Sequence, residues 1–452
     1  MTTSSIPLRS KVKNGSANKL LEADRAAHDW YRFVLSFPPQ LVRVYIARFG
    51  VTGSSCVLDP FCGTGTTLVE CQKQGIPSIG IEANPMAHFA SMVKTDWKLD
   101  PDQMIAHASN VADAASGILE ADGIPDDPIL CLEAKPPYPL RTLPTESMEL
   151  LLTNSISSIP LHKTLVLLEC LKEYRRSEFD CHERLALAKA LVTAIGNLQF
   201  GPEVGVGTLK QDASVVNSWI GTLSAMADDL RALISLNNVR AVVHHADARN
   251  LSDLLAPRSV DAVITSPPYP NEKDYTRTTR LESVLLGFIR NKAELRTLKQ
   301  GLVRSNTRSV YRGDDDDHWI RQMPEIEEIA QAIEARRIEL GKTSGFERLY
   351  GRVTKLYFGG MARHLAQLRP VLKPGASLAY VVGDQASYLR IMIPTGQLLA
   401  KIAQSLGYEV VGIDLFRTRL ATTTREQLRE EVVVLRWPGN TGFDLSGTRA
   451  IG

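Results

Sequence analysis

The segment from Ser54 to Ala87, SSCVLDPFCGTGTTLVECQKQGIPSIGIEANPMA, restricts the possible folds more than any other part of the chain. A strand is predicted over 56–58, a glycine-rich turn follows it, and a helix is predicted over 67–74. Gly75 is expected to end that helix, and a second strand over 78–81 ends at Glu82. Strand, turn, helix and strand in this order predict a βαβ unit of a parallel sheet.

The rest of the chain extends this pattern and interrupts it twice. Further strands are predicted within 240–251, within 260–269, over 378–382 and in the segment EEVVVLRW. We therefore predict an α/β fold with a doubly wound, mostly parallel sheet and helices on both faces. The predicted parts are a flexible arm (1–27) and a core (28–97, 239–289 and 351–440). A helical insertion (98–238) could serve recognition, act as a lid or form a dimer surface. A second helical insertion (290–350) has a possible role in target recognition. The acidic run 314–317 is predicted to be a solvated loop.

Composition limits the partners and the location of the protein. The 452 residues include 52 basic and 50 acidic ones, so a nucleic-acid site would have to be a local basic patch. No apolar stretch reaches the length of about 18 residues that a membrane span requires, and the polar N-terminus lacks the apolar region of a secretory signal. The six cysteines form no C-x-x-C pair, so we expect no metal site and a cytoplasmic protein with reduced thiols.

Polar residues stand at the ends of four predicted strands: Asp59, Glu82, Asp247 and Ser266. In sheets of this type, ligands bind beyond the carboxyl ends of the strands. Asp59 would suit a cationic ligand end, Glu82 could accept the two hydroxyls of a ribose, and Asp247 could accept from an adenine amino group. A ligand with these three parts is S-adenosylmethionine. A dinucleotide fingerprint is incomplete because Leu68 occupies the place of its third glycine.

Several motifs resemble those of one enzyme family. DPFCGTGTT, from Asp59, is similar to motif I of the S-adenosylmethionine-dependent DNA amino-methyltransferases, and TSPPY, from Thr265, is similar to their motif IV. The segment SFPPQLVRVYIARFG resembles the stretch before motif I in that family, and VLKPGASLAYVVGD resembles the late helix, turn and strand of the general methyltransferase fold. The resemblance implies a class I methyltransferase (Rossmann-like) fold, S-adenosylmethionine as the cofactor and double-stranded DNA as the substrate.

The resemblance also implies roles for individual residues. The target base would be held by Ser266, Pro267, Pro268 and Tyr269. The cofactor would be held by Phe37, Pro38, Asp59, Phe61, Gly63, Gly65, Thr66, Glu82, Asp247 and Ala248.

The SPPY corner suits methyl transfer to an exocyclic amino group. The lone pair of such a nitrogen is delocalised into the ring, and acceptors aimed at its two protons draw it towards tetrahedral geometry. The Ser266 hydroxyl and the Pro267 carbonyl could be those acceptors, since proline fixes the backbone in advance, and Tyr269 could stack on a flipped base. Within the resembled family, serine at the first position goes mostly with N4 of cytosine. The chain lacks the Pro-Cys pair that methylation at carbon 5 requires, so we interpret Cys62 as a packing residue.

DNA contacts are predicted at Arg277 and Arg280, which follow SPPY closely, and at Arg304 and Arg308 within a basic run from Arg290 to Arg312. A solvated helix face is an equally good interpretation of that run. Three alternatives remain open at this point: an N6-adenine DNA methyltransferase, an RNA base methyltransferase, and a nucleic-acid-binding protein that only retains the fold. By family analogy we expect a restriction–modification or other defence setting, with a cognate restriction endonuclease as a possible partner.

Overall fold

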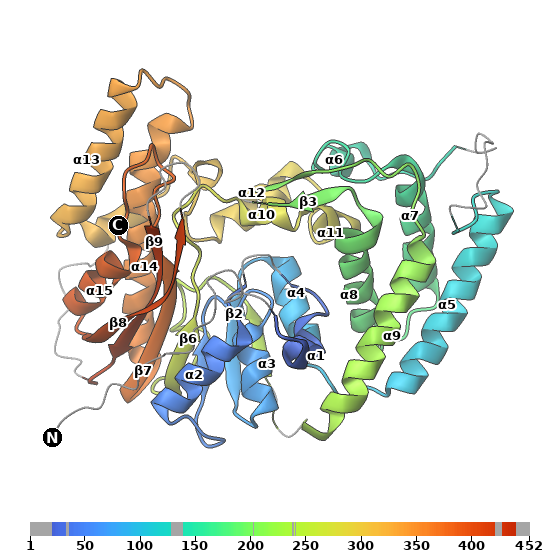
Figure 1. The fold of residues 1–452 in the computed structure, drawn as a ribbon, viewed down its shortest axis with the longest axis horizontal. Coiled ribbons are helices and arrows are strands. Elements are labelled where there is room, and N and C mark those ends of the chain that lie inside the picture. Colours follow the sequence, from blue (N-terminus) through green and yellow to red (C-terminus); the bar gives the residue numbers. More distant parts are fainter. Residues whose placement is uncertain are drawn as a thin grey trace.

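A seven-stranded sheet forms the centre of the computed structural model, with the strand order β5-β2-β1-β6-β7-β9-β8 (Figure 1). The structure describes residues 20–32, 36–127, 139–201, 203–236, 239, 241–420 and 427–439. The strands are β1 (Val57–Asp59), β2 (Ser78–Glu82), β5 (Ala241–His245), β6 (Val260–Thr265), β7 (Leu372–Gly383), β8 (Glu409–Leu420) and β9 (Gln427–Arg436). Neighbours from β5 to β7 pair in parallel, whereas β9 runs antiparallel to β7 and β8. The predicted α/β class with a mostly parallel sheet is confirmed.

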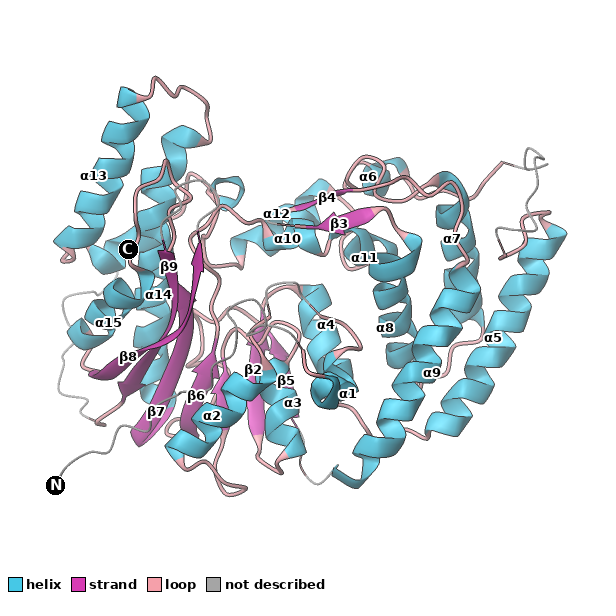
Figure 2. Ribbon diagram, viewed as in Figure 1, coloured by secondary structure: helices cyan, strands magenta, loops and turns pink. Residues whose placement is uncertain are grey.

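Helices cover both faces of the sheet because its central strands are apolar on both sides. On β1 and β6, Leu58 and Val263 contact one helical layer, whereas Val57, Ala262 and Ile264 contact the other, as the two-residue period of a strand requires. The first layer contains α13 (Pro324–Glu339), α14 (Tyr350–Leu368) and α15 (Thr395–Ser405), and the second contains α2 (Pro39–Phe49) and α3 (Thr66–Lys73) (Figure 2).

The first inserted segment packs beside the sheet as a group of helices. Its described elements are α5 (Pro101–Ala121), α6 (Thr145–Met148), α7 (Ser158–Glu173), α8 (Asp180–Ala190) and α9 (Val215–Leu233), with a hairpin of β3 (Leu198–Phe200) and β4 (Val204–Val206). Their apolar core is continuous with Phe89 and Val93 of α4 (Pro85–Lys94), so these helices are joined to the flank of the sheet. The hairpin is absent from the sequence prediction, because strands this short show no period-two alternation.

The second inserted segment follows α10 (Tyr275–Thr278) and α11 (Arg280–Leu285). It contains α12 (Lys292–Gln300), the short 3-10 helix η6 (Asp316–Ile320) and α13. The prediction of a solvated loop at 314–317 is wrong at Asp316, whose residue is only 4% exposed. Its carboxylate pairs with Arg249 at 2.5 Å and with Arg363 at 3.3 Å, and these two cations explain how the acid can be buried.

The predicted flexible arm also needs correction over its described part. Within 20–27, Asp24 accepts hydrogen bonds from Arg43 at 2.9 and 3.0 Å, and Ala27 is fully buried in the core that α4 shares with the first insertion. These contacts fix the chain against the core rather than leaving it loose. Residues 1–19 of the predicted arm lie outside the described residues.

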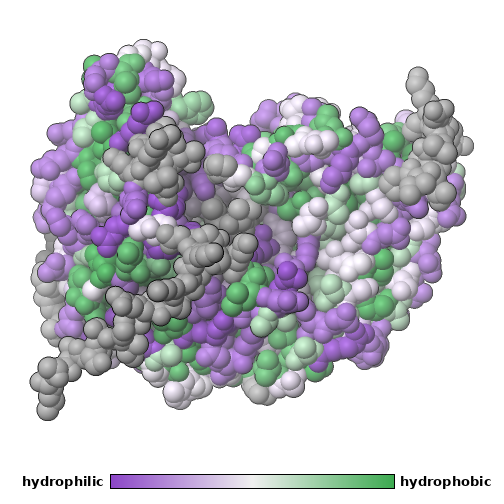
Figure 3. Space-filling view, viewed as in Figure 1, coloured by the Kyte–Doolittle hydropathy of each residue, from purple (hydrophilic) through white to green (hydrophobic). Residues whose placement is uncertain are grey.

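The surface carries polar side chains over both halves of the molecule. Figure 3 shows hydrophilic residues over the sheet and over the inserted helices, interrupted by small hydrophobic patches. Among the residues that the structure describes, no helix has both the length and the apolar character needed to cross a membrane. The apolar residues of the long helices α5 and α9 are instead buried in the shared core.

Candidate active site

The turn after β1 depends on two glycines with left-handed backbone angles. Gly63 has φ +53° and Gly65 has φ +85°, a region that favours glycine, and α3 begins at the next residue, Thr66. A Cβ atom on Gly65 would lie 3.0 Å from the Cβ atom of Ser91 in α4, so the close approach of that helix also requires glycine. The turn therefore brings backbone N–H groups to the carboxyl edge of the sheet.

Glu82, at the end of β2, is fixed beside this turn. Its Oε2 accepts from the backbone N–H of Gly63 at 2.8 Å, and its Oε1 accepts from the backbone N–H of Asn84 at 2.7 Å. Burial raises the pKa of Glu82 from 4.5 to about 7, although these hydrogen bonds act in the opposite direction. Each carboxylate oxygen keeps further acceptor capacity, which two adjacent hydroxyl groups of a ligand could use.

Asp59, at the end of β1, links the first and fourth predicted strands. Its Oδ1 accepts from the Thr265 hydroxyl at 2.6 Å and from the backbone N–H of Phe61 at 3.2 Å. Its Oδ2 is buried and makes no hydrogen bond with any described residue. Burial raises its pKa from 3.8 to about 6. Because Thr265 precedes Ser266 directly, this carboxylate ties the glycine turn to the SPPY corner.

The SPPY corner begins where β6 ends. The Ser266 hydroxyl donates to the backbone carbonyl of Val381 in β7 at 3.1 Å, so its proton is already used and its oxygen lone pairs serve as acceptors. The backbone N–H of Tyr269 donates to the Tyr275 hydroxyl at 3.3 Å. These two bonds fix both ends of the corner, and its two prolines restrict the backbone between them.

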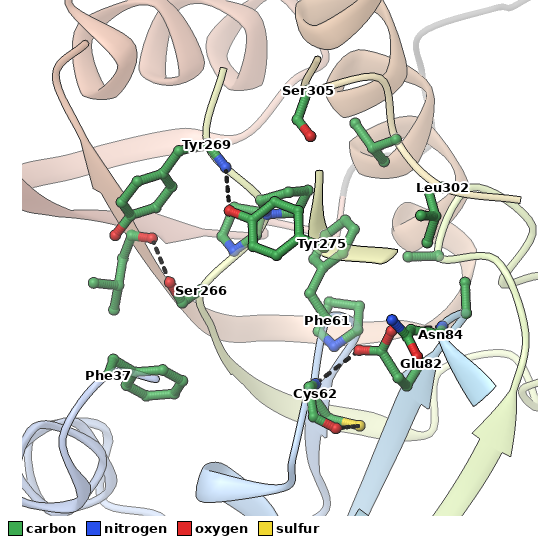
Figure 4. Close-up of a pocket in the computed structure, with 18 of the residues that line it drawn as sticks. Phe37, Phe61, Cys62, Glu82, Asn84, Ser266, Tyr269, Tyr275, Leu302 and Ser305 are labelled. Atoms are coloured by element: carbon green, nitrogen blue, oxygen red, sulfur yellow. Dashed lines mark hydrogen bonds between the residues drawn. The ribbon is translucent and has the colours of Figure 1, made fainter. Parts of the chain in front are cut away.

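A single cavity joins the glycine turn to the SPPY corner, and it encloses about 1510 Å³ when its open mouth is counted. Figure 4 shows Glu82, Asn84 and Leu302 towards one end and Ser266, Tyr269 and Phe37 towards the other, with Phe61 and Tyr275 between them. The predicted site residues that line it are Phe37, Phe61, Gly63, Thr66, Glu82, Asp247, Ala248, Ser266, Pro267, Pro268 and Tyr269. Pro38, Asp59 and Gly65 do not line it.

The polar groups around the cavity suit the parts of S-adenosylmethionine. At one end, Glu82 presents carboxylate oxygens suited to ribose hydroxyls, and Asp247 adds a second acid suited to the adenine amino group. The unpartnered Oδ2 of Asp59, directly behind the glycine turn, supplies negative charge near the place that the cationic part would occupy. The aromatic ring of Phe61 adds an apolar wall between the two ends.

Asp247 is held by a buried arginine that the sequence analysis did not single out. Arg249 donates from Nε to both carboxylate oxygens of Asp247 at 3.0 Å and from Nη2 to one of them at 2.7 Å. Its other arm reaches Asp316 of η6, and Nη2 also donates to the Gln300 carbonyl at 3.1 Å. Gly301 and Leu302, which follow Gln300, line the cavity, so the second insertion supplies part of its wall.

The backbone carbonyl of Ala248 is held by a hydrogen bond to a buried histidine. Its carbonyl lies 2.8 Å from Nδ1 of His364 in α14, and Nε2 of the same ring lies 2.7 Å from the Tyr380 hydroxyl. Burial lowers the pKa of His364 to about 4, so the ring is neutral at physiological pH. The His364 ring also meets Phe61 edge-on, with centroids 4.8 Å apart. Nothing in the sequence around position 364 distinguishes this histidine from an ordinary helix residue.

Two of the four predicted DNA contacts need correction. Arg280 is 9% exposed and donates to the Thr276 and Leu150 carbonyls, and Arg304 is 3% exposed and pairs with Asp314 at 2.8 Å. Buried side chains with these partners are not available to phosphates. Arg308 is exposed, and Arg277 is half-buried, with an Nε atom that makes no hydrogen bond to a described residue. The latter two stay predictions.

Comparison with known proteins gives matches to DNA methyltransferases. A DNA methylase family model matches residues 8–92. The Type II methyltransferase M.BsoBI of Geobacillus stearothermophilus is 25% identical over 94% of this chain and 86% of its own length. M.AvaI of a Nostoc species is 24% identical over 95% of this chain and 90% of its own, and M.MjaII of Methanocaldococcus jannaschii is 38% identical over 16% of this chain and 14% of its own.

Solved structures give only weak likenesses. TrmN from Thermus thermophilus is 11% identical and covers 88% of this chain and 48% of its own, with a TM-score of 0.28, which is too low to bear on fold or function. The family model, which covers the glycine turn, and the full-length relatives, which cover most of the chain, have more weight. They confirm the predicted similarity of this chain to the S-adenosylmethionine-dependent DNA amino-methyltransferases.

Proposed function

We propose that the protein methylates the exocyclic amino group of a base flipped out of double-stranded DNA, at N4 of cytosine within a specific sequence. The observation that carries this proposal is the hydrogen bond from the Ser266 hydroxyl to the Val381 carbonyl. A hydroxyl whose proton is committed in this way can only accept from an incoming amino group. Serine in this position is also the residue that the resembled family mostly pairs with N4 of cytosine.

The chain's own groups account for the steps around methyl transfer. When bound, S-adenosylmethionine supplies an electrophilic methyl group on a sulfonium sulfur. Ser266 and the Pro267 carbonyl would accept the two amino protons and draw the nitrogen towards tetrahedral geometry, while the Tyr269 ring would stack on the base. Glu82 and Asp247 would orient the cofactor from the other end of the cavity. Placing two reactants in one cavity makes their reaction effectively unimolecular.

The names of the relatives, Type II methyltransferases, support a restriction–modification setting, with a cognate endonuclease as a proposed partner. Such a setting requires methylation at one recognition sequence. The proposal therefore extends to sequence-specific action on duplex DNA.

The test is to incubate the purified protein with unmethylated phage DNA and S-adenosylmethionine, digest the DNA to nucleosides and identify the product by mass spectrometry. We expect N4-methylcytosine, and methylation-sensitive sequencing of the same DNA should map it to one sequence. N6-methyladenine would refute the choice of base but keep the amino-methyltransferase assignment. Activity on RNA and none on DNA would refute the substrate.

A further inference from the structure

The wall of the cavity next to the SPPY corner carries a group of charged residues that the mechanism above does not use. Three cations, Lys273, Arg417 and Arg419, and one acid, Glu430, line the cavity there. Arg417 and Arg419 lie on β8 and Glu430 lies on β9, where Arg417 and Glu430 are paired across the two strands. We call these four residues the cationic wall.

The cationic wall lies beside the residue proposed to stack on the target base. Gly383, at the end of β7, has no side chain, and a Cβ atom there would lie 3.2 Å from the Tyr269 ring and 3.3 Å from the Glu430 side chain. The Tyr269 ring and the Glu430 side chain therefore both lie next to this glycine. Glu430 is 8% exposed, whereas the Arg419 side chain is 38% exposed, so the wall runs from the interior of the cavity towards its mouth.

The positive charges in the wall exceed the negative ones. Glu430 accepts from Nε of Arg417 at 2.5 Å, whereas Nε of Arg419 is 3.6 Å away from it. Nη2 of Arg419 donates to the Asp384 carbonyl at 3.2 Å and to the Gln385 side-chain oxygen at 3.1 Å, which fixes the guanidinium. Its Nε is buried and makes no hydrogen bond to any described residue. A buried donor of this kind calls for an acceptor from a ligand.

We propose that Arg419 reads the acceptor edge of the target cytosine and so helps to select that base. This inference rests on the proposed function. With the amino group of the base at Ser266 and its ring on Tyr269, cytosine would present N3 and O2 towards the remaining wall, and both atoms are acceptors. Adenine in the same place presents N1 followed by a C–H group, which leaves a guanidinium donor unpaired.

The two ends of the cavity thus differ in chemistry in the sense that their two ligands require. Acids, Glu82 and Asp247, line the end assigned to the ribose and adenine of the cofactor, whose hydroxyl and amino groups are donors, and cations line the end assigned to a base edge with two acceptors. A flipped nucleotide also brings phosphates, which the same cations could bind at the mouth. The buried Nε of Arg419, which lies 3.6 Å from the Glu430 carboxylate inside the cavity wall, favours the base edge.

The test compares two duplexes that carry the mapped recognition sequence, one with cytosine and one with an abasic residue at the target position. Both keep the phosphates, and only the first keeps the base. Binding is measured by fluorescence anisotropy with saturating S-adenosylhomocysteine. For Arg419→Met we expect a loss of affinity of about 10- to 100-fold on the cytosine duplex and little change on the abasic one. Arg419→Lys, which keeps the charge but loses the fork of donors, should show a smaller loss on cytosine.

The control is Arg429→Met, on β9, where the exposed arginine pairs with Glu431 at 2.6 Å and does not line the cavity. It should bind both duplexes like the wild type. Equal losses on both duplexes for Arg419→Met would show a phosphate contact and overturn the proposal, as would no loss on either. Calorimetric binding of S-adenosylhomocysteine checks that each variant is folded, and if Arg419→Met fails this check, Arg419→Lys decides in the same way. The wild-type product, read separately by mass spectrometry, tests the proposed function itself.

Discussion

Replacing Arg249 by methionine should destabilise the protein more than any ordinary surface change, because it breaks a buried network of charges. The Arg249 side chain is 7% exposed and bridges Asp247 to Asp316, whose side chain is 6% exposed. Removing one partner of a buried pair leaves the other charges without compensation and costs about 3–5 kcal/mol. We expect a loss of this size in the free energy of unfolding, measured by urea denaturation.

Arg363→Met is the matched control. Arg363 pairs with the same Asp316 at 3.3 Å, but its side chain is 33% exposed. Solvent screens such a pair, so its loss should cost at most about 1 kcal/mol. Calorimetry should also show weaker S-adenosylmethionine binding for Arg249→Met, because the same guanidinium fixes Asp247 and the Gln300 carbonyl beside the cavity wall. Equal destabilisation by the two variants would refute the reasoning.

Three further predictions follow from the same structure. Ser266→Ala should lower the methylation rate by about 100-fold or more, since it removes a pre-aimed acceptor, while calorimetric cofactor affinity stays unchanged. Burial raises the Glu82 pKa from 4.5 to about 7. The contribution of this group to folding stability is therefore present below pH 4.5 and is lost as the pH rises through about 7. The unfolding free energies of wild type and Glu82→Gln, measured by denaturation, should diverge between these two pH values. A Cβ atom on Gly359 would lie 2.0 Å from the Asp316 carbonyl oxygen, so Gly359→Ala should cost about 1–3 kcal/mol in urea denaturation, whereas Gly221→Ala in α9, with open space around it, should be neutral or stabilising.

The strand ends of the site could be predicted from the sequence because local rules determine them. β1 and β2 are short apolar runs, each ending at an acid, and the parallel pairing Val57↔Ser78 brings their carboxyl ends to one edge. The prolines after β6 likewise mark the point where the strand must stop. Each strand and the motif at its end can be predicted from a few consecutive residues, so Glu82 and Ser266 could be placed in one crevice from the sequence alone.

The buried charges could not be predicted, because their partners are distant in the sequence. Arg304 reads as one member of a basic surface run, yet it pairs with Asp314 and donates to the Lys299 carbonyl inside the second insertion. Asp316 is predicted as part of a solvated acidic run, yet Arg249, which is 67 residues away in the sequence, pairs with it. A charged residue shows no local sign of burial, since burial depends on whether the fold brings an opposite charge within reach.

These internal ion pairs bear on which of the two insertions shapes the cavity and which one reads the DNA target. Within the second insertion, Lys299 and Arg304 form buried ion pairs beside the cavity wall at 301–306 and are unavailable to phosphates. The other cations of its basic run are exposed: Arg290, Lys292, Arg296, Arg308 and Arg312. A segment that shapes the cofactor cavity also cannot vary freely with the DNA sequence to be read, because each change would disturb Asp247 through Arg249. None of the described residues of the first insertion forms part of the cavity lining. We propose that the first insertion reads the target, and we expect that exchanging this segment between related enzymes alters the methylated sequence while cofactor affinity is retained.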